Sequence, residues 1–123
     1  EFRKENPDKE YNAIVSVEVL EHLAHPLEFM KNCVALLKSG GMLIITTPNK
    51  DYQQIFEGRK QIAEAMGQIW IMDQPPVHLA IYGKKAMEYI AKETGTKVEI
   101  FDRHPGFAEI SGSPNMVAMF TKP

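Results

Sequence analysis

The sequence predicts an α/β domain built on an open sheet whose first strands are parallel. Two short runs rich in β-branched residues, 13–17 and 42–47, have the apolar pattern of strands that are buried on both faces. Between these runs, apolar residues recur every three or four positions after Pro26, which is the pattern of an amphipathic helix. A crossover of this length between two buried strands is typical of a parallel pair with a right-handed connection.

The helix between the two strands has clear signals at both ends. Pro26 suits a first helical turn, and Ser39, Gly40 and Gly41 supply residues that tolerate a positive φ where a helix must stop. Its apolar stripe consists of Leu27, Phe29, Met30, Cys33, Val34, Leu36 and Leu37. Cys33 lies on this stripe, so we expect a small buried side chain and no nucleophilic role.

The second half of the chain predicts two more helices and two more strands. Residues 51–67 have helical spacing, and residues 68–76 form a proline-containing loop. Residues 84–94 carry one apolar face and are followed by Gly95, which is typical of a helix that ends there. The runs 98–101 and 116–120 are strand candidates, and because no helix lies between them we expect them to pair antiparallel.

Composition excludes several classes of function. With 44% apolar and 24% charged residues, 123 residues form one globular domain, and no apolar run approaches the roughly 18 to 20 residues that span a bilayer. The net charge of −2 provides no field that would attract DNA. A single cysteine cannot form an intrachain disulfide, so we expect a cytoplasmic protein. Residues 1–10 form a polar lead-in, and the chain starts without Met, so we expect it to be a piece of a longer protein.

Charged residues that could meet a ligand follow the first predicted strand. Ligands of open parallel sheets bind outside the carboxyl ends of the strands, which is where Glu18, Glu21 and His22 stand in the sequence. If a helix begins at Val17, these three residues are spaced i, i+3 and i+4 and share one face. A short helical turn with two solvated acids and a surface histidine fits the same spacing equally well.

The string YNAIVSVEVLEHLAHPLEFMKNCVALLKSGGMLIITTPN, residues 11–49, resembles strand four, the following helix and strand five of class I S-adenosylmethionine-dependent methyltransferases. The most specific pieces are VEVLEHL, the helix-opening Pro26, LLKSGG, where the family usually has Pro in place of Ser39, and ITTPN. PPVHL at 75–79, with the helix after it, is similar to the segment before the family's last two strands. The resemblance implies a partial Rossmann-like fold in which residues 11–123 form the C-terminal half, strands four to seven.

Two parts of the family's cofactor site are absent from the sequence. The family has a glycine-rich loop after its first strand and an acidic residue at the end of its second, whereas the one adjacent glycine pair here, Gly40 and Gly41, ends a helix. The resemblance therefore implies that one edge of strand four lacks its usual partner. An exposed edge predicts pairing with another chain, such as a homo-oligomer, and weak cofactor binding by this chain alone.

Site residues carry over from the resemblance position by position. Ser16, Val17 and Glu18 match the strand-end positions that touch S-adenosylmethionine. In the small-RNA 2′-O-methyltransferases and the ubiquinone-type O-methyltransferases, the Glu-x-x-Glu-His pattern and a later histidine bind a divalent cation. The matching positions, which would hold Mg²⁺, Mn²⁺ or Zn²⁺, are Glu18, Glu21, His22 and His78.

Three functional interpretations follow. The resemblance implies methyl transfer from S-adenosylmethionine to an oxygen of a small-molecule or RNA acceptor, by positioning and with no covalent role for the protein. In a metal-assisted variant, the cation lowers the pKa of the acceptor hydroxyl. The absent glycine-rich loop fits a third interpretation, an inactive binding or dimerisation module. The alternative to metal binding is a structural role for each residue: Glu21 caps or pairs at a helix start, His22 hydrogen-bonds a neighbouring loop, and His78 anchors the proline-containing loop by bonding backbone.

Overall fold

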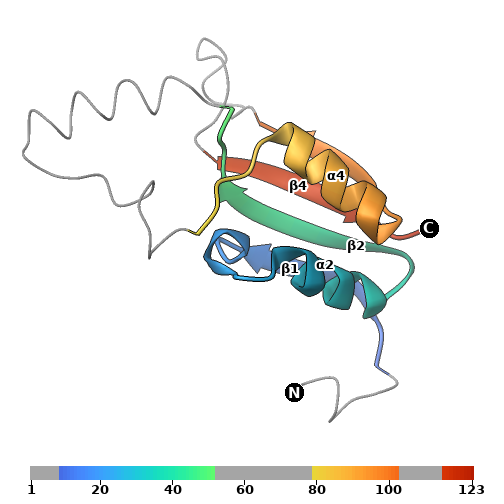
Figure 1. The fold of residues 1–123 in the computed structure, drawn as a ribbon. Coiled ribbons are helices and arrows are strands. Elements are labelled where there is room, and N and C mark those ends of the chain that lie inside the picture. The colour runs from blue at the N-terminus through green and yellow to red at the C-terminus, as the bar shows by residue number, and fades with distance from the viewer. Residues whose placement is uncertain (1–8, 52–78, 103–114) are drawn as a thin grey trace, which may run out of the picture.

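A computed structural model describes residues 9–51, 79–102 and 115–123 of the chain and has a mixed α/β architecture (Figure 1). Its elements in chain order are β1 (Tyr11–Val17), the 3₁₀ helix η1 (Leu20–His22), α2 (Pro26–Ala35), β2 (Leu37–Pro48), α4 (Lys84–Thr94), β3 (Lys97–Phe101) and β4 (Asn115–Thr121). The predicted α/β class is confirmed. The helix predicted over 51–67 and the loop predicted over 68–76 fall on residues outside the described ranges.

The strands form a four-stranded sheet in the order β1-β2-β4-β3. β1 and β2 are parallel, with Val15 opposite Ile44, as the buried runs and the helical crossover predicted. β4 lies antiparallel to both β2 and β3, which confirms the antiparallel pairing predicted for the last two strands. β1 therefore ends one side of the sheet within the described residues.

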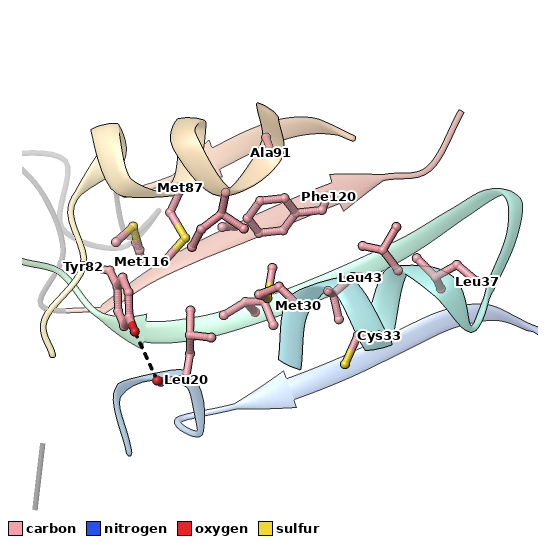
Figure 2. Packing of buried hydrophobic residues seen from close by; sticks show 14 residues of the cluster. Leu20, Met30, Cys33, Leu37, Leu43, Tyr82, Met87, Ala91, Met116 and Phe120 are labelled. Carbon is pink, nitrogen blue, oxygen red and sulfur yellow. Dashed lines mark hydrogen bonds between the residues drawn. The ribbon is translucent and has the colours of Figure 1, made fainter. Parts of the chain in front are cut away.

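The two α-helices pack side by side on one face of the sheet (Figure 1). Alternate residues of the inner strands point into this layer, including the fully buried Leu43, Ile45 and Phe120. Met30 from α2 and Met87 from α4 meet them from the other side (Figure 2). Each such side chain contributes about 1.5–3 kcal/mol when it is removed from water, so this layer is the main source of stability.

The prediction that β1 is buried on both faces is wrong. Ser16 points into the helical layer and is buried, whereas Val15 and Val17 on the opposite face are 61% and 60% exposed. β1 is a terminal strand of the described sheet, and both described α-helices lie on the other face. An apolar run of consecutive residues therefore does not by itself distinguish an interior strand from an edge strand.

The helix after β1 ends earlier than its apolar stripe predicted. α2 ends at Ala35, and Leu37, which the stripe included, begins β2 and pairs with Tyr11. Gly40 has φ +75°, the positive φ expected of a glycine that ends a helix. It lies inside β2, however, and its N–H donates to the carbonyl oxygen of Lys122. In contrast, α4 has its predicted bounds and is followed by Gly95 at φ +67°.

Within the described ranges, neither α-helix has the length and apolar composition needed to cross a lipid bilayer.

Candidate functional site

The carboxyl ends of β1 and β2 lie together at one edge of the sheet. Val17 is opposite Thr46 in the parallel register, and η1 follows β1 after two residues. The chain returns to this edge near Tyr82, which forms a parallel bridge with Asn49. Three segments that are distant in the sequence therefore meet where open α/β sheets bind their ligands.

Glu18, the first residue after β1, has a strained backbone. Its φ is +50°, and no other described residue except glycine has a positive φ. Its N–H donates to the carbonyl oxygen of Thr46 at 3.0 Å and lies 3.3 Å from the Thr46 hydroxyl oxygen. A left-handed conformation costs a non-glycine residue about 1–2 kcal/mol, and such strain concentrates at ligand sites, where the surrounding structure enforces it.

Glu21 is a fully buried carboxylate in η1. Its Oε2 accepts a hydrogen bond from the Thr47 hydroxyl at 3.1 Å, and its Oε1 is buried with no hydrogen-bond partner among the described residues. A buried carboxylate oxygen without a hydrogen bond is energetically costly, and in native folds such an atom is explained by strain, by a bound water or ion, or by a functional role.

His22 lies next to this oxygen at the surface. Its Nε2 is 3.9 Å from Glu21 Oε1, which is the distance of a long ion pair when the imidazole is protonated, and its side chain is 42% exposed. The partly exposed imidazole therefore lies beside the buried carboxylate, beyond hydrogen-bond distance.

Backbone and hydroxyl contacts hold the turn that carries these groups. The Tyr82 hydroxyl donates to the carbonyl of Leu20 at 3.3 Å (Figure 2), and the carbonyl of Glu21 accepts the N–H of Leu79 at 2.8 Å. Burial, and secondarily the negative charge of Glu21, raises the pKa of the Tyr82 hydroxyl above its ordinary value. The phenol therefore stays protonated and able to donate over the physiological pH range.

The segment after β2 is tied to the start of α4. The N–H of Lys50 donates to the carbonyl of Tyr82 at 2.9 Å, and Asp51 Oδ2 accepts the N–H of Lys84 at 2.7 Å. Asp51 thereby satisfies a free N–H at the first turn of α4. These bonds fix the end of β2 and the start of α4 beside η1.

The predicted cofactor residues lie at the expected strand end, on different faces of the sheet. Ser16 is 7% exposed and its Oγ has no hydrogen-bond partner in the part of the chain that the structure describes, whereas Val17 is on the open face. Cys33 is buried, and burial raises the pKa of its thiol, in agreement with the structural role predicted for it.

The expected helical face of Glu18, Glu21 and His22 is not formed. η1 begins only at Leu20, and the left-handed Glu18 is outside it, so the i, i+3, i+4 relation does not apply. Among the described residues, no three His, Cys, Asp or Glu side chains lie close enough together to hold a metal ion. His78, the fourth predicted ligand, is outside the described ranges.

Sequence reasoning did not single out Thr47, the hydrogen-bond donor to Glu21. Thr47 is fully buried in β2 and is 26 residues from its partner. The only available signal was its position in the run ITTPN, near the end of a strand.

Comparison with known families gives a match over most of the chain. The model of a family described as "Methyltransferase domain" matches residues 2–99. Among curated proteins, the ubiquinone biosynthesis O-methyltransferase of Parvibaculum lavamentivorans is 40% identical over 40 residues, which are 32% of this chain and 16% of that protein. The same enzyme of Coxiella burnetii (strain RSA 493 / Nine Mile phase I) is 40% identical over 43 residues, or 35% of this chain and 18% of the relative. These alignments thus span about a sixth of the relatives' length.

Solved structures with the same fold cover nearly all of the chain. The methyltransferase domain of bacterial CtHen1 superposes with a TM-score of 0.61 at 21% identity, over 94% of this chain and 55% of that one. The small RNA methyltransferase HEN1 gives 0.61 at 19% identity, over 94% and 14% of the two chains. A SAM-dependent methyltransferase from Archaeoglobus fulgidus gives 0.66 at 14% identity, over 98% and 63%. At these identities the likeness establishes the fold.

Proposed function

This chain belongs to the methyltransferase-domain family, and from that membership we propose that it forms part of the site of an enzyme that methylates an oxygen atom with S-adenosylmethionine. The structural observation that carries the proposal is the strained Glu18 at the carboxyl end of β1. A small-molecule or RNA hydroxyl is the acceptor we propose, since the similar proteins include ubiquinone biosynthesis O-methyltransferases and a small RNA methyltransferase. Family membership favours this enzyme over the inactive binding module.

In this proposal, residues 11–123 supply one half of the cofactor site and residues 1–10 lead into it. Ser16, Val17 and Glu18 would hold S-adenosylmethionine, which fits the orphaned Ser16 Oγ and the enforced backbone of Glu18. When bound, the cofactor supplies an electrophilic methyl group on its sulfonium. The chain's part is to orient the cofactor against the acceptor oxygen, which is a positioning task.

Glu18→Gly is the sharpest test of the cofactor residues. Glycine adopts a positive φ without strain, so we expect the free energy of unfolding to rise by about 1 kcal/mol while S-adenosylmethionine binding weakens. Binding of S-adenosylmethionine is followed by the amide chemical-shift changes of a ¹⁵N-labelled chain. In the unsubstituted chain we expect weak binding, with the largest chemical-shift changes at residues 16–18.

Glu99→Gly is the matched control for that substitution. Glu99 is exposed in β3, at the other side of the sheet. We expect Glu99→Gly to lower the free energy of unfolding and to leave the affinity for S-adenosylmethionine unchanged. Cofactor-induced shifts centred on β3, or an unchanged affinity of Glu18→Gly, would contradict the assignment.

A divalent cation is a second candidate feature of the site, favoured by the orphaned oxygen of Glu21 beside His22. A carboxylate oxygen and an imidazole nitrogen are suitable ligands for Mg²⁺, Mn²⁺ or Zn²⁺, and we propose that Glu18 and His78 complete the set. Such a cation would lower the pKa of an acceptor hydroxyl at this strand end.

Thermal unfolding with added Mn²⁺ tests the cation site. Because a ligand bound only to the folded state raises the melting temperature, we expect an increase that is lost in Glu21→Gln and His22→Asn. His25→Asn, a substitution of the histidine that precedes α2, is the control and should keep the increase. An increase that survives both site substitutions would eliminate these ligands.

We also propose that the edge of β1 that has no partner strand among the described residues is completed by a strand from the part of a methyltransferase domain that this chain does not match, or by a second copy. β1 has no charged residue and no proline, the usual protections of an exposed edge, and both of its valines are solvent-exposed. Light scattering tests this pairing. The chain alone is expected to self-associate as its concentration rises, and Val15→Lys should suppress that; a chain that stays monomeric throughout would contradict it.

We propose a cytoplasmic location and no DNA partner, on sequence grounds. The one cysteine is buried and unpaired with another thiol, and the net charge of the chain is −2.

A further inference from the structure

We propose that Tyr82 is a positioning residue for the cofactor site: its hydroxyl holds η1 in place and thereby keeps Glu18 in the left-handed conformation at the end of β1. This inference rests on the S-adenosylmethionine site proposed above and adds a residue that acts on that site through Leu20. It is carried by the 3.3 Å hydrogen bond from the Tyr82 hydroxyl to the carbonyl oxygen of Leu20 (Figure 2) and by the φ of +50° at Glu18.

Tyr82 is anchored independently of η1. Its side chain is buried in the hydrophobic core, and its backbone forms a parallel bridge with Asn49, just after β2. The carbonyl oxygen of Tyr82 also accepts the N–H of Lys50 at 2.9 Å, and α4 begins two residues later. The position of the phenol hydroxyl is therefore set by the sheet and by α4.

The turn that carries Glu18 depends on contacts from outside it. η1 has three residues, and the apolar side chain of its N-cap residue, Val19, cannot accept a capping hydrogen bond. So short a 3₁₀ helix has little stability of its own, because it forms few hydrogen bonds for the backbone freedom that it loses. The N–H of Glu18 is bonded to Thr46. Two residues later, the carbonyl of Leu20 is bonded to Tyr82. Because both ends are held, the backbone between them cannot relax the positive φ, which persists only where the surrounding structure enforces it.

Tyr82→Phe removes the hydroxyl and keeps the ring that packs in the core. The backbone hydrogen bonds from Leu79 and Ala80 to the carbonyl of Glu21 remain, so the turn is loosened and not detached. In the ¹⁵N-labelled full chain without ligand, we expect the amide resonances of residues 18–22 to shift. We also expect S-adenosylmethionine to bind about 2- to 10-fold more weakly, the equivalent of one lost hydrogen bond.

Tyr89→Phe is the matched control, because it removes the same group from an exposed side chain in α4. It should change neither the amide resonances of residues 18–22 nor the affinity for S-adenosylmethionine. Glu18→Gly, measured in both backgrounds, separates positioning from a simple loss of stability. Glycine adopts a positive φ without strain, so its gain in the free energy of unfolding reports the strain at this position. We expect that gain to fall to about half or less in Tyr82→Phe and to be unchanged in Tyr89→Phe, since only coupled residues depart from additivity.

A reduced gain together with weaker cofactor binding in Tyr82→Phe supports the positioning role. An equal gain from Glu18→Gly in the unsubstituted and the Tyr82→Phe chains, or an unchanged affinity of Tyr82→Phe, would overturn the role of Tyr82 and leave the proposed function standing. An unsubstituted chain that does not bind S-adenosylmethionine would overturn the proposed cofactor site and this inference with it.

Discussion

Phe120→Ala is expected to lower the free energy of unfolding by about 3–5 kcal/mol, the range measured when a large buried aromatic side chain is truncated. Phe120 is fully buried and is the largest side chain at the centre of the helical layer, where β4 faces both α-helices (Figure 2). Its removal loses apolar burial and leaves a cavity that the rigid sheet cannot close. Denaturant unfolding followed by circular dichroism measures the loss.

Phe101 provides a control of the same residue type in the adjacent strand. Its side chain is 52% exposed on the other face of the sheet, so Phe101→Ala should cost less than about 1 kcal/mol, as surface substitutions do. If Phe120→Ala leaves too little folded protein to measure, Phe120→Leu gives a smaller loss in the same direction. Equal losses at the two phenylalanines would show that the buried layer is placed on the wrong face.

Gly41→Ala is expected to be the second most damaging substitution, at about 1–3 kcal/mol for a side-chain atom forced into a packed site. A Cβ at Gly41 would lie 2.9 Å from the carbonyl oxygen of Lys38 and 3.1 Å from that of Tyr11. Both oxygens are backbone atoms at the point where β1 begins to pair with β2. We therefore expect the alanine side chain to shift the register of this parallel pair. Denaturant unfolding and amide exchange of the β1 residues measure the effect.

Gly40 is the matched comparison, because it is the adjacent glycine with a different constraint. A Cβ there would meet no atom within 4 Å, but φ is +75°. Gly40→Ala should therefore cost about 1–2 kcal/mol through backbone strain alone, and Gly40→Asn should recover part of that because Asn tolerates a left-handed φ. A register change in Gly40→Ala, or none in Gly41→Ala, would contradict this division of roles.

Elements whose limits are set by local signals were predicted well. α4 has the bounds that its apolar face and Gly95 indicated, because the cap is a property of neighbouring residues. The end of α2 was missed, since Leu37 leaves the helical stripe to pair with Tyr11 in the sheet. The open face of β1 was also missed, because its burial depends on which elements cover the sheet.

The candidate site was likewise predicted in part from the sequence. Its location at the end of β1 was predicted from topology alone, and Glu18, Glu21 and His22 do lie there. Their common helical face was not formed, because Glu18 adopts a positive φ and bonds Thr46 in the neighbouring strand. The contact between Glu21 and Thr47 depends on the three-dimensional path of the chain and has no periodic signature in the sequence.

The bonds that join residues 49–51 to residues 82–84 have a consequence for how this domain tolerates variation. The hydrogen bonds of Lys50 with Tyr82 and of Asp51 with Lys84 hold two points of the chain together that are about 30 residues apart in the sequence. When two points of a chain are held together in this way, each doubling of the number of residues between them costs about 0.6 kcal/mol in loop-closure entropy. We therefore expect the sheet to tolerate changes in the number of residues between Asp51 and Tyr82, with a small cost in the free energy of unfolding.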